Sequence, residues 1–461
     1  MDFTQAYKQS NFLVEFSKGA QWILTAVEDR LIVRRADSFL IERTWLVEPT
    51  PITHIGWSWD SEYVFGANSK QGVVNVFKIT DETWNARVVA GAEGLARVEW
   101  APDGRSIICF SEWGLRVTIW SLTTGSATYI QFPIHPDKGY CYRADGRYFI
   151  LAERHKSKDT IGVYDTAGAY RVVKHFPVPT SCLASISLAP TGNYLAVWEG
   201  SLEYKLFIYT LVGTLQGSFS PMEDPGFGIR CVAWHPTGAY LAVGGWDDKI
   251  YILDNLTWKP VTIFEFQARV PPGVNVWREP VGWLEATHGR GFLSYERPKV
   301  TWLPTKKPDL TKPKPKVGTV QLEWNKTGSL LLARYENAPT VVHVYEFPYT
   351  LSKEINLSLT DVPRLRSLLI QQQPVVQASW NPVRKGVLSL CTGGSGLYTW
   401  SDEWIGEDGE EEMAECVGIP AIRFESRAIR WSPDGKGMAL LDRDTFCCAF
   451  EVTDSDVLDD Q

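Results

Sequence analysis

A short polar turn that follows an aromatic or apolar residue recurs nine times and constrains this chain more than any other feature. It reads FSKG, WSWDS, WAPDG, YRADG, LAPTG, WHPTG, WNKTG, WNP and WSPDG, opening at Phe16, Trp57, Trp100, Tyr142, Leu188, Trp234, Trp324, Trp380 and Trp431. Each turn is followed by a β-rich run that ends in a large residue, and in eight clear cases the two markers lie 19 to 22 residues apart. The intervals between turns vary from 41 to 90 residues, whereas this inner spacing hardly changes. We therefore interpret the pattern as nine repeated structural units.

The strands inside these units require cover on both faces. Segments 194–198 (YLAVW) and 240–245 (YLAVGG) are apolar at nearly every position, which is typical of strands buried on two sides. Radially stacked four-stranded sheets provide this cover, and a period of about 40–45 residues fits WD-type blades. The sequence predicts an all-β fold, a WD-type β-propeller that forms a single ring of about nine four-stranded blades. A ring of seven or eight blades with extra strands and a pair of fused incomplete rings are the alternatives.

The repeat markers also predict the boundaries within one domain, residues 1–461. The blades are expected at about 11–52, 53–95, 96–138, 139–183, 184–228, 229–266, 317–374, 375–425 and 426–461. The last unit supplies only three strands, so residues 1–10 are expected to provide a closing outer strand and to remove an open sheet edge. The repeated Trp residues are interpreted as packing between blades.

Charge and cysteine content narrow the class of protein. Lys and Arg number 46 against 54 Asp and Glu, a net charge of −8, which argues against a global electrostatic footprint for nucleic acid. The eight cysteines form no CxxC pair, which favours buried thiols in a reducing compartment. The first ten residues lack a basic segment followed by an apolar stretch, and no apolar run reaches 18 residues. We expect a soluble cytosolic or nuclear protein with no secretory signal and no membrane span.

Two irregular segments interrupt the repeat. Residues 267–316 form a Pro- and Lys-rich insertion, and from Thr287 to Lys316 it holds eight Lys or Arg against two acids. Its prolines favour extended chain, so we interpret it as a solvated surface loop, with partner docking and nucleic-acid binding as alternatives. Residues 401–415 contain eight acids and are interpreted as a solvated loop.

The chain carries none of the common catalytic motifs. The chain has no GxxxxGK[ST] loop and no GxSxG, and its seven histidines show no HxH or HExxH spacing. We expect no enzymatic activity, no cofactor and no metal site. A propeller enzyme with carboxylates lining a central channel remains an alternative.

The loops between the second and third strands of the units are the candidate binding surface. Such loops gather on one rim of a propeller, and Trp, Tyr and Arg side chains dominate interface hot spots. The predicted partner-binding residues on this rim are Trp113, Arg154, His155, Tyr204, Trp246 and Tyr335.

Several long stretches resemble one known family. They are WAPDGRSIICFSEWGLRVTIWSL (100–122), RADGRYFILAERHKSKD (143–159), LAVWEGSLEYKLFIY (195–209), LDNLTWKPVTIFEF (253–266) and CTGGSGLYTW (391–400). They are similar to the WD repeat-containing protein eight family, whose vertebrate members are named WD-repeat proteins antisense to the p seventy-three gene. The resemblance extends from Phe3 to about Phe450 and is poor over 267–316 and 401–415.

The resemblance implies a non-enzymatic adaptor of the cytoplasm and cytoskeleton, located at the microtubule organising centre, which is the centrosome or the spindle pole body. Its expected partners are a coiled-coil spindle-anchoring protein of the synovial sarcoma breakpoint-interacting type and a minus-end-directed kinesin, with an indirect link to microtubules and gamma-tubulin. Together they would tether microtubule minus ends to the pole of the mitotic spindle. The alternative is a ribosome- or RNA-associated scaffold that resembles the propellers of translation initiation factors, with the basic 287–316 segment as its contact.

Overall fold

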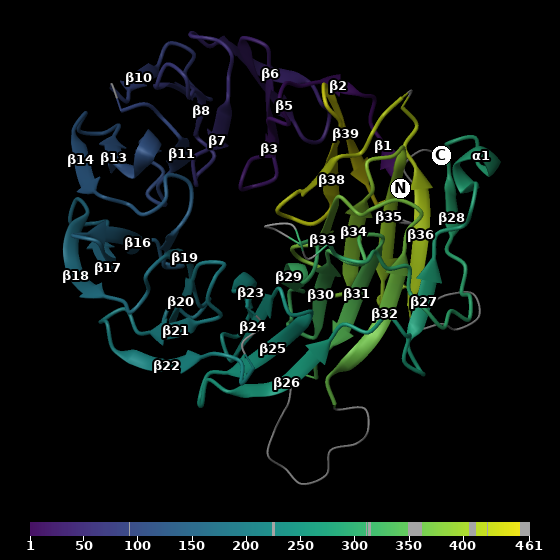
Figure 1. The fold of residues 1–461 in the computed structure, drawn as a ribbon. Helices are drawn as coiled ribbons and strands as arrows, with labels where there is room; N and C mark the ends of the chain where they lie inside the picture. Colours follow the sequence, from purple (N-terminus) through teal and green to yellow (C-terminus); the bar gives the residue numbers. More distant parts are fainter. Residues whose placement is uncertain are drawn as a thin grey trace. The chain divides into compact units, whose positions relative to one another are not determined.

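The chain folds into nine β-sheets within the residues that the structure describes. The computed structural model describes residues 1–91, 93–223, 226–309, 311, 315–348, 362–404, 412–421 and 423–451. Contacts divide the chain into two compact units, the N-terminal unit (residues 8–222) and the C-terminal unit (residues 1–7 and 223–461). The described strands form nine sheets of four or five strands (Figure 1). The fold is an all-β WD-type propeller of nine blades, whereas the arrangement of residues 1–461 as one ring and one domain stays a prediction.

Five four-stranded sheets make up the N-terminal unit, each with its strands in chain order. The first two are β3 (Val14–Phe16), β4 (Trp22–Val27), β5 (Arg30–Arg35), β6 (Ile41–Leu46) and β7 (His54–Trp57), β8 (Tyr63–Asn68), β9 (Val73–Lys78), β10 (Asn85–Val89). The third is β11 (Arg97–Trp100), β12 (Ser106–Phe110), β13 (Arg116–Ser121) and β14 (Ala127–Gln131), with a 3-10 helix η1 (Glu112–Gly114) between its second and third strands. The last two are β15 (Tyr140–Tyr142), β16 (Tyr148–His155), β17 (Lys158–Asp165), β18 (Arg171–Pro177) and β19 (Leu183–Leu188), β20 (Leu195–Glu199), β21 (Leu206–Tyr209), β22 (Leu215–Phe219).

Four sheets make up the C-terminal unit, and three of them are less regular. The first is β23 (Ile229–Trp234), β24 (Tyr240–Gly245), β25 (Lys249–Asp254) and β26 (Pro260–Glu265). The next two are built from β29 (Thr319–Trp324), β30 (Leu330–Tyr335), β31 (Val341–Glu346), β32 (Arg364–Ile370) and β33 (Gln377–Trp380), β34 (Val387–Cys391), β35 (Gly396–Ser401), β36 (Met413–Gly418). The last holds β37 (Ala428–Trp431), β38 (Gly437–Leu441) and β39 (Thr445–Phe450). The only described α-helix in this unit, α1 (Trp283–Ala286), is four residues long, and no described helix could cross a membrane.

The turn that defines the repeat connects the first two strands of a sheet. In the turn after Trp100, the Asp103 carboxylate accepts hydrogen bonds from the backbone N–H groups of Arg105 and Ser106 at 2.9 and 2.8 Å. Gly104 adopts φ +63°, which glycine reaches without the strain of a Cβ. The strand β19 begins at Leu183, one residue before its predicted blade, and the predicted blade boundaries stay a prediction.

At five positions the repeated Trp residues connect a sheet to the one before it within the same unit. Each indole N–H donates to the backbone carbonyl of the residue that precedes the equivalent aromatic position of the preceding sheet. The pairs are Trp57 to Glu15 (3.0 Å), Trp100 to Gly56 (3.1 Å), Trp324 to Ala233 (3.1 Å), Trp380 to Glu323 (3.0 Å) and Trp431 to Ser379 (3.4 Å). The interpretation of these residues as packing between blades is confirmed, and the hydrogen bond explains why the position favours Trp over other large residues.

The N-terminal segment takes the outer position of the last sheet. The strand β1 (Asp2–Phe3) pairs antiparallel with β39, with Asp2 opposite Phe450 and Phe3 opposite Ala449. The Tyr7 ring, from β2 (Tyr7–Lys8), contacts the Phe446 ring with centroids 5.6 Å apart. The expected outer strand is therefore present, and it covers the edge that β39 would otherwise expose.

The interpretation of residues 267–316 as a solvated loop is wrong for much of the segment. Its strand β27 (Asn275–Arg278) pairs parallel with β32, and β28 (Phe292–Ser294) pairs antiparallel with β36, so each adds a fifth strand to a sheet (Figure 1). Trp277, Trp283 and Tyr295 are buried in the core between these two sheets. The sequence did not indicate these strands, because Pro and Lys dominate the composition of the segment and the three buried aromatic residues occupy only part of it.

Candidate functional site

Trp113 is the most exposed of the predicted binding residues. It lies in η1, between β12 and β13, and 88% of its surface is accessible. Its backbone is in the left-handed region at φ +65°, which is rare for a bulky residue. At the next residue, Gly114, a Cβ would lie 2.8 Å from the carbonyl oxygen of Pro133. The loop therefore holds a large apolar side chain in solvent at a cost in backbone strain, a pattern that is often associated with function.

Three further residues extend this exposed surface. The Phe132 N–H donates to the Leu115 carbonyl at 3.1 Å, and both side chains are about half exposed. Phe132 also has a left-handed backbone, with φ +62°, and its ring contacts the His155 ring edge-on at 5.6 Å between centroids. We call Trp113, Leu115, Phe132 and His155 the Trp113 surface. All four belong to the N-terminal unit, and two of them come from the predicted set.

Arg154 has a structural partner rather than a free side chain. Its guanidinium donates to the Asp159 carboxylate at 2.8 Å, and this contact raises the pKa of Arg154. Asp159 is buried and also accepts hydrogen bonds from the Thr180 hydroxyl and the Leu183 N–H, each at 2.9 Å. Arg154 thus neutralises a carboxylate that fixes the start of the next sheet.

Two of the predicted rim residues do not lie on a surface. Tyr204 is 3% exposed and packs edge-on against Phe219, and Tyr335 is 1% exposed with its hydroxyl 3.0 Å from that of Tyr345. The prediction that these side chains contact a partner is wrong, because the loop that carries Tyr204 and the end of β30, which carries Tyr335, turn their rings into the core. Trp246 is partly exposed, and the Arg230 guanidinium lies over its ring at 4.2 Å. Trp246 stays a prediction as a binding residue.

The structure also brings together residues that the sequence search missed. Glu153 and His155 on β16 and His175 on β18 offer three ligand atoms within 4.8 Å of one another, the one group of this kind among the described residues. Glu153 and His155 are two positions apart on a strand, so they share a face. A search for acidic residues two positions from a histidine on a strand would have found the first pair, but nothing in the sequence identifies His175 as their neighbour.

In the C-terminal unit, buried glutamates anchor residues 275–295 to the neighbouring sheets. Glu279 accepts hydrogen bonds from the Trp283 indole N–H and the Tyr398 hydroxyl, both at 2.8 Å. Burial and this carboxylate raise the pKa of Tyr398, so its hydroxyl stays protonated and donates. Glu412 accepts from the Trp277 indole N–H at 2.8 Å. These contacts satisfy buried polar atoms on both sides and give the insertion a defined position.

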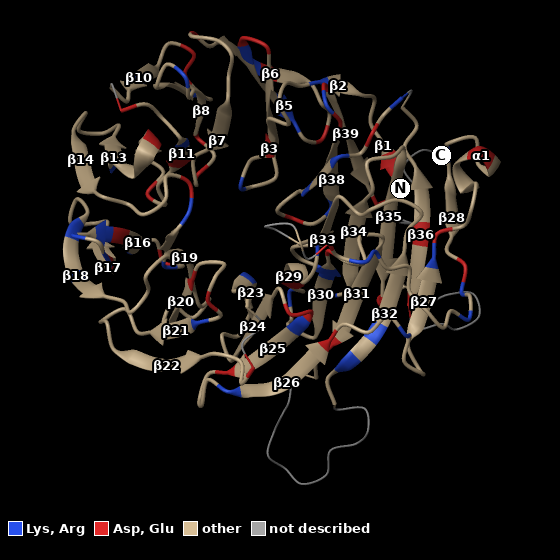
Figure 2. Cartoon of the chain, viewed as in Figure 1, with Lys and Arg blue, Asp and Glu red and all other residues tan. Residues whose placement is uncertain are grey.

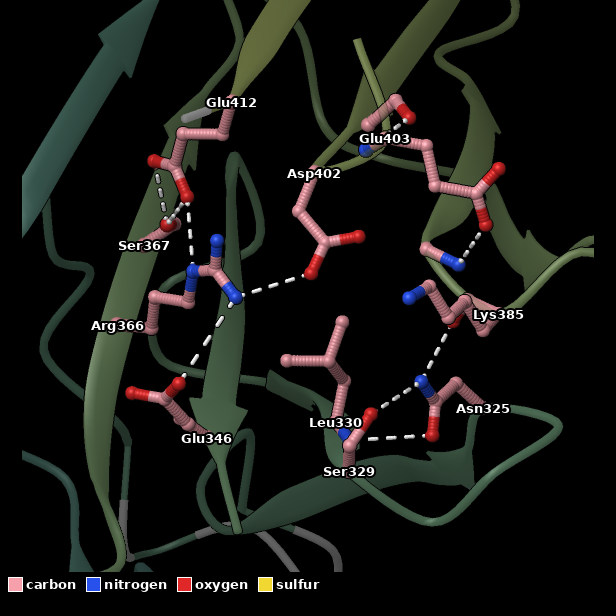
Figure 3. A network of polar contacts seen from close by, with 12 residues as sticks. Asn325, Ser329, Leu330, Glu346, Arg366, Ser367, Lys385, Asp402, Glu403 and Glu412 are labelled. Atoms are coloured by element: carbon pink, nitrogen blue, oxygen red, sulfur yellow. Dashed lines mark hydrogen bonds and ion pairs between the residues drawn. The ribbon is translucent and has the colours of Figure 1, made fainter. Parts of the chain in front are cut away.

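Arg366 is the centre of a network that includes the ends of the acidic segment (Figure 3). Its guanidinium lies 3.0 Å from Glu412, 2.9 Å from Asp402 and 3.9 Å from Glu346. Burial is the largest influence on Asp402 and raises its pKa. The interpretation of residues 401–415 as a solvated loop is therefore wrong at Asp402 and Glu412, while residues 405–411 lie outside the described part of the chain.

A groove of about 660 Å³ runs between the two arms of the insertion. Its lining includes Arg269, Arg297 and Lys299 together with Val270 and Val300 and no carboxylate among the described residues. Arg297 also lies over the Trp277 ring at 4.9 Å. Elsewhere basic and acidic residues are interspersed on both units (Figure 2). We call this feature the insertion groove.

Comparisons with known proteins identify one WD repeat in the chain and show relatives that match almost its whole length. The family model for the WD domain, G-beta repeat, matches residues 210–254. The chain is 30% identical over 477 aligned residues to the WD repeat-containing protein WRAP73 of Mus musculus, covering 98% of this chain and 96% of that protein. It is 20% identical over 487 aligned residues to an uncharacterized WD repeat-containing protein of Schizosaccharomyces pombe, covering 99% and 94% of the two chains. The C-terminal WD40 domain of Sif2 has the same fold, with a TM-score of 0.50, 12% identity and coverage of 90% of this chain and 98% of that one.

Proposed function

The chain belongs to the family of the WD repeat-containing protein WRAP73, and from this premise we propose that it is a non-enzymatic adaptor at the microtubule organising centre. In this proposal it binds a coiled-coil spindle-anchoring protein and acts with a minus-end-directed kinesin to tether microtubule minus ends. A propeller scaffold supports such a role, because its loops present binding residues on a rigid framework. The family likeness over 98% of the chain is the main support for the choice of partners.

The observation that supports a binding role most directly is the Trp113 surface. An α-helix from a coiled-coil protein binds through apolar side chains spaced along one face. Trp113, Leu115 and Phe132 offer neighbouring apolar side chains, each at least half exposed. Trp side chains contribute strongly to such contacts because they bury a large area. We therefore assign the coiled-coil partner to this surface.

Affinity capture from mitotic cells tests the partner. Tagged wild-type protein should co-purify with a coiled-coil protein and a kinesin, and the tag should mark the spindle poles. A diffuse signal without a coiled-coil partner would refute the proposal. Co-sedimentation with ribosomes instead would favour the ribosome-associated alternative, and deletion of residues 287–316 should then abolish it.

Substitutions of exposed Trp residues test the surface. Trp113→Ala should lower capture of the coiled-coil partner by at least about tenfold, the effect of losing roughly 1.4 kcal/mol at a hot spot. Trp59→Ala is the matched control, since Trp59 belongs to the same unit, is 54% exposed and contacts Lys18. Trp302→Ala tests the insertion, where Trp302 is 65% exposed. Loss of capture in Trp302→Ala with normal capture in Trp113→Ala would transfer the binding site to the insertion.

A further inference from the structure

The side chains of Glu153, His155 and His175 converge at one end of the sheet formed by β15–β18. The Glu153 oxygen Oε2 lies 2.7 Å from Nε2 of His155 and 3.0 Å from Nε2 of His175. Glu153 is buried, whereas both imidazoles are more than a third exposed. The carboxylate is thus held in the protein while the two rings connect it to solvent.

Strand register explains how residues on non-adjacent strands meet. Leu151 on β16 lies opposite Gly162 on β17, and Gly162 lies opposite His175 on β18. The side chain of Glu153 therefore extends across the face of β17 to reach His175, and it passes over Gly162. A Cβ at Gly162 would overlap the Glu153 carboxylate and lie 2.6 Å from Cε2 of Tyr164. Glycine at this position leaves the space that the carboxylate occupies.

Two other features hold the group in place. The Tyr164 hydroxyl donates to the second Glu153 oxygen, Oε1, and burial followed by the carboxylate itself raises the pKa of Tyr164. Tyr164 therefore remains a donor and fixes the orientation of the carboxylate. The hairpin after His155 turns through Lys156 and Ser157, both with positive φ (+48° and +65°) although neither is glycine. Strained turns of this kind are found next to functional sites, and this one sets the position of His155.

We propose that Glu153, His155 and His175 bind a zinc ion. Two imidazole nitrogens and one carboxylate oxygen are a donor set that zinc uses with three protein ligands and one open position. Tetrahedral coordination at about 2.0–2.2 Å from the ion places ligand atoms roughly 3.3 Å apart. The two N–O distances of 2.7 and 3.0 Å are shorter than this by about 0.6 and 0.3 Å, and all three ligand atoms already lie within 4.8 Å of one another, so modest side-chain rotations would complete the site. Water takes the fourth position on the exposed side. The hydroxyl of Tyr164 donates a hydrogen bond to the ligating carboxylate and so orients it.

Zinc at this position would also act on the Trp113 surface. The His155 ring contacts the Phe132 ring, so an ion that fixes the imidazole would limit the movement of Phe132 as well. The metal site does not depend on the proposed adaptor function, because its ligands and its test require only the purified chain.

Zinc titration of the purified full-length protein, after treatment with a chelator, tests the proposal. Competition with a chromogenic chelator should show one tightly bound equivalent, and Co²⁺ in its place should give visible absorption bands. His155→Gln and His175→Gln should each weaken binding by at least about tenfold, and Tyr164→Phe by about tenfold through the lost outer contact. His288→Asn removes an exposed imidazole at positive φ in the other unit and should leave binding unchanged.

Folding of the variants is monitored in the same experiment. In the presence of a chelator each variant should remain folded, and the readout is the gain in melting temperature when zinc is added. The gain should be full in the wild type and His288→Asn, smaller in Tyr164→Phe and smallest in the two histidine variants. A measurement on the wild type alone needs no variant: zinc should protect His155 and His175 from acylation by diethyl pyrocarbonate while His288 continues to react. Absence of zinc binding, binding that survives both histidine substitutions, or no protection of these two rings would overturn the proposal.

Discussion

The two units consist of the same kind of blade but differ in how many strands the blades have and in the burial of their aromatic residues outside the repeat. In the N-terminal unit all five sheets stop at four strands, and aromatic residues such as Trp113 and Phe132 are left exposed on strained backbone. In the C-terminal unit β27 and β28 add a fifth strand to two sheets, and the indoles of Trp277 and Trp283 are buried against Glu412 and Glu279, whereas Phe292 on β28 is exposed. Exposed residues on strained backbone are suited to binding, whereas buried residues with satisfied polar atoms stabilise the fold. Under the proposed function, the Trp113 surface would contact a partner, whereas the buried residues of the insertion stabilise the fold.

The largest expected effect is the loss of an anchor in the C-terminal unit. Glu412→Ala would leave the Trp277 indole N–H, the Ser367 hydroxyl and the Arg366 guanidinium without their shared acceptor. Removing one partner of a buried ion pair costs about 3–5 kcal/mol, so native-state hydrogen exchange should show destabilisation of β27 and β32. Glu425→Ala is the control, because its ion pair with Arg427 is half exposed and such pairs contribute about 0–1 kcal/mol. Equal effects of the two substitutions would mean that the insertion is not anchored by Glu412.

The indole hydrogen bond between neighbouring sheets occurs within both units. Removing it should lower the unfolding free energy less than the loss of Glu412, and by a similar amount in each unit. Trp100→Phe and Trp380→Phe keep an aromatic ring but remove the indole N–H that binds the preceding sheet. Leaving a buried carbonyl without its donor costs about 1–3 kcal/mol, measured by urea unfolding. Matching losses in the two units would support one blade design, and a loss confined to one unit would contradict it.

The stability of the protein in acid should depend on His343, which lies on β31. Burial lowers the pKa of His343 to about 3 from its usual 6.5, and neither ring nitrogen has a hydrogen-bond partner among the described residues. Below pH 6.5 the unfolded chain gains a proton that the native protein excludes, so the stability that the neutral ring provides decreases as the pH falls toward 3. The decrease attributable to this ring is up to about 1.4 kcal/mol per pH unit.

Replacing the imidazole isolates this contribution. His343→Leu should flatten the fall in unfolding free energy between pH 6.5 and pH 4, while His288→Asn should follow the wild type. A His343→Leu profile parallel to that of the wild type would show that His343 does not limit acid stability.

The smallest expected effect is a gain in stability in the N-terminal unit. Trp113→Gly relieves a left-handed backbone that costs a bulky residue about 1 kcal/mol, so thermal unfolding should occur at an equal or higher temperature. The same variant should capture less of the coiled-coil partner. A Trp113→Gly protein that is clearly less stable would identify Trp113 as a packing residue and remove the contrast between the two units.

Much of the fold can be predicted from the sequence because it is repeated. The turns at Trp100 and Trp431 locate the sheets since Pro, Asp and Gly have local conformational preferences that do not depend on distant residues. The insertion was misinterpreted because its structure depends on remote partners: Glu412 is 135 positions from Trp277, and no local pattern joins them. Tyr204 and Tyr335 failed as predicted contact residues for the same reason, since the direction in which a side chain turns in a loop or at the end of a strand depends on the packing around it.

Hydrogen–deuterium exchange on the purified complex with its coiled-coil partner tests the contrast between the units most directly. The account predicts that binding protects peptides covering residues 111–116 and 131–134, which carry Trp113, Leu115 and Phe132, and leaves those covering 268–276 and 297–302 unchanged. Protection confined to the insertion peptides, with none around Trp113, would contradict the assignment of binding to one unit and support to the other.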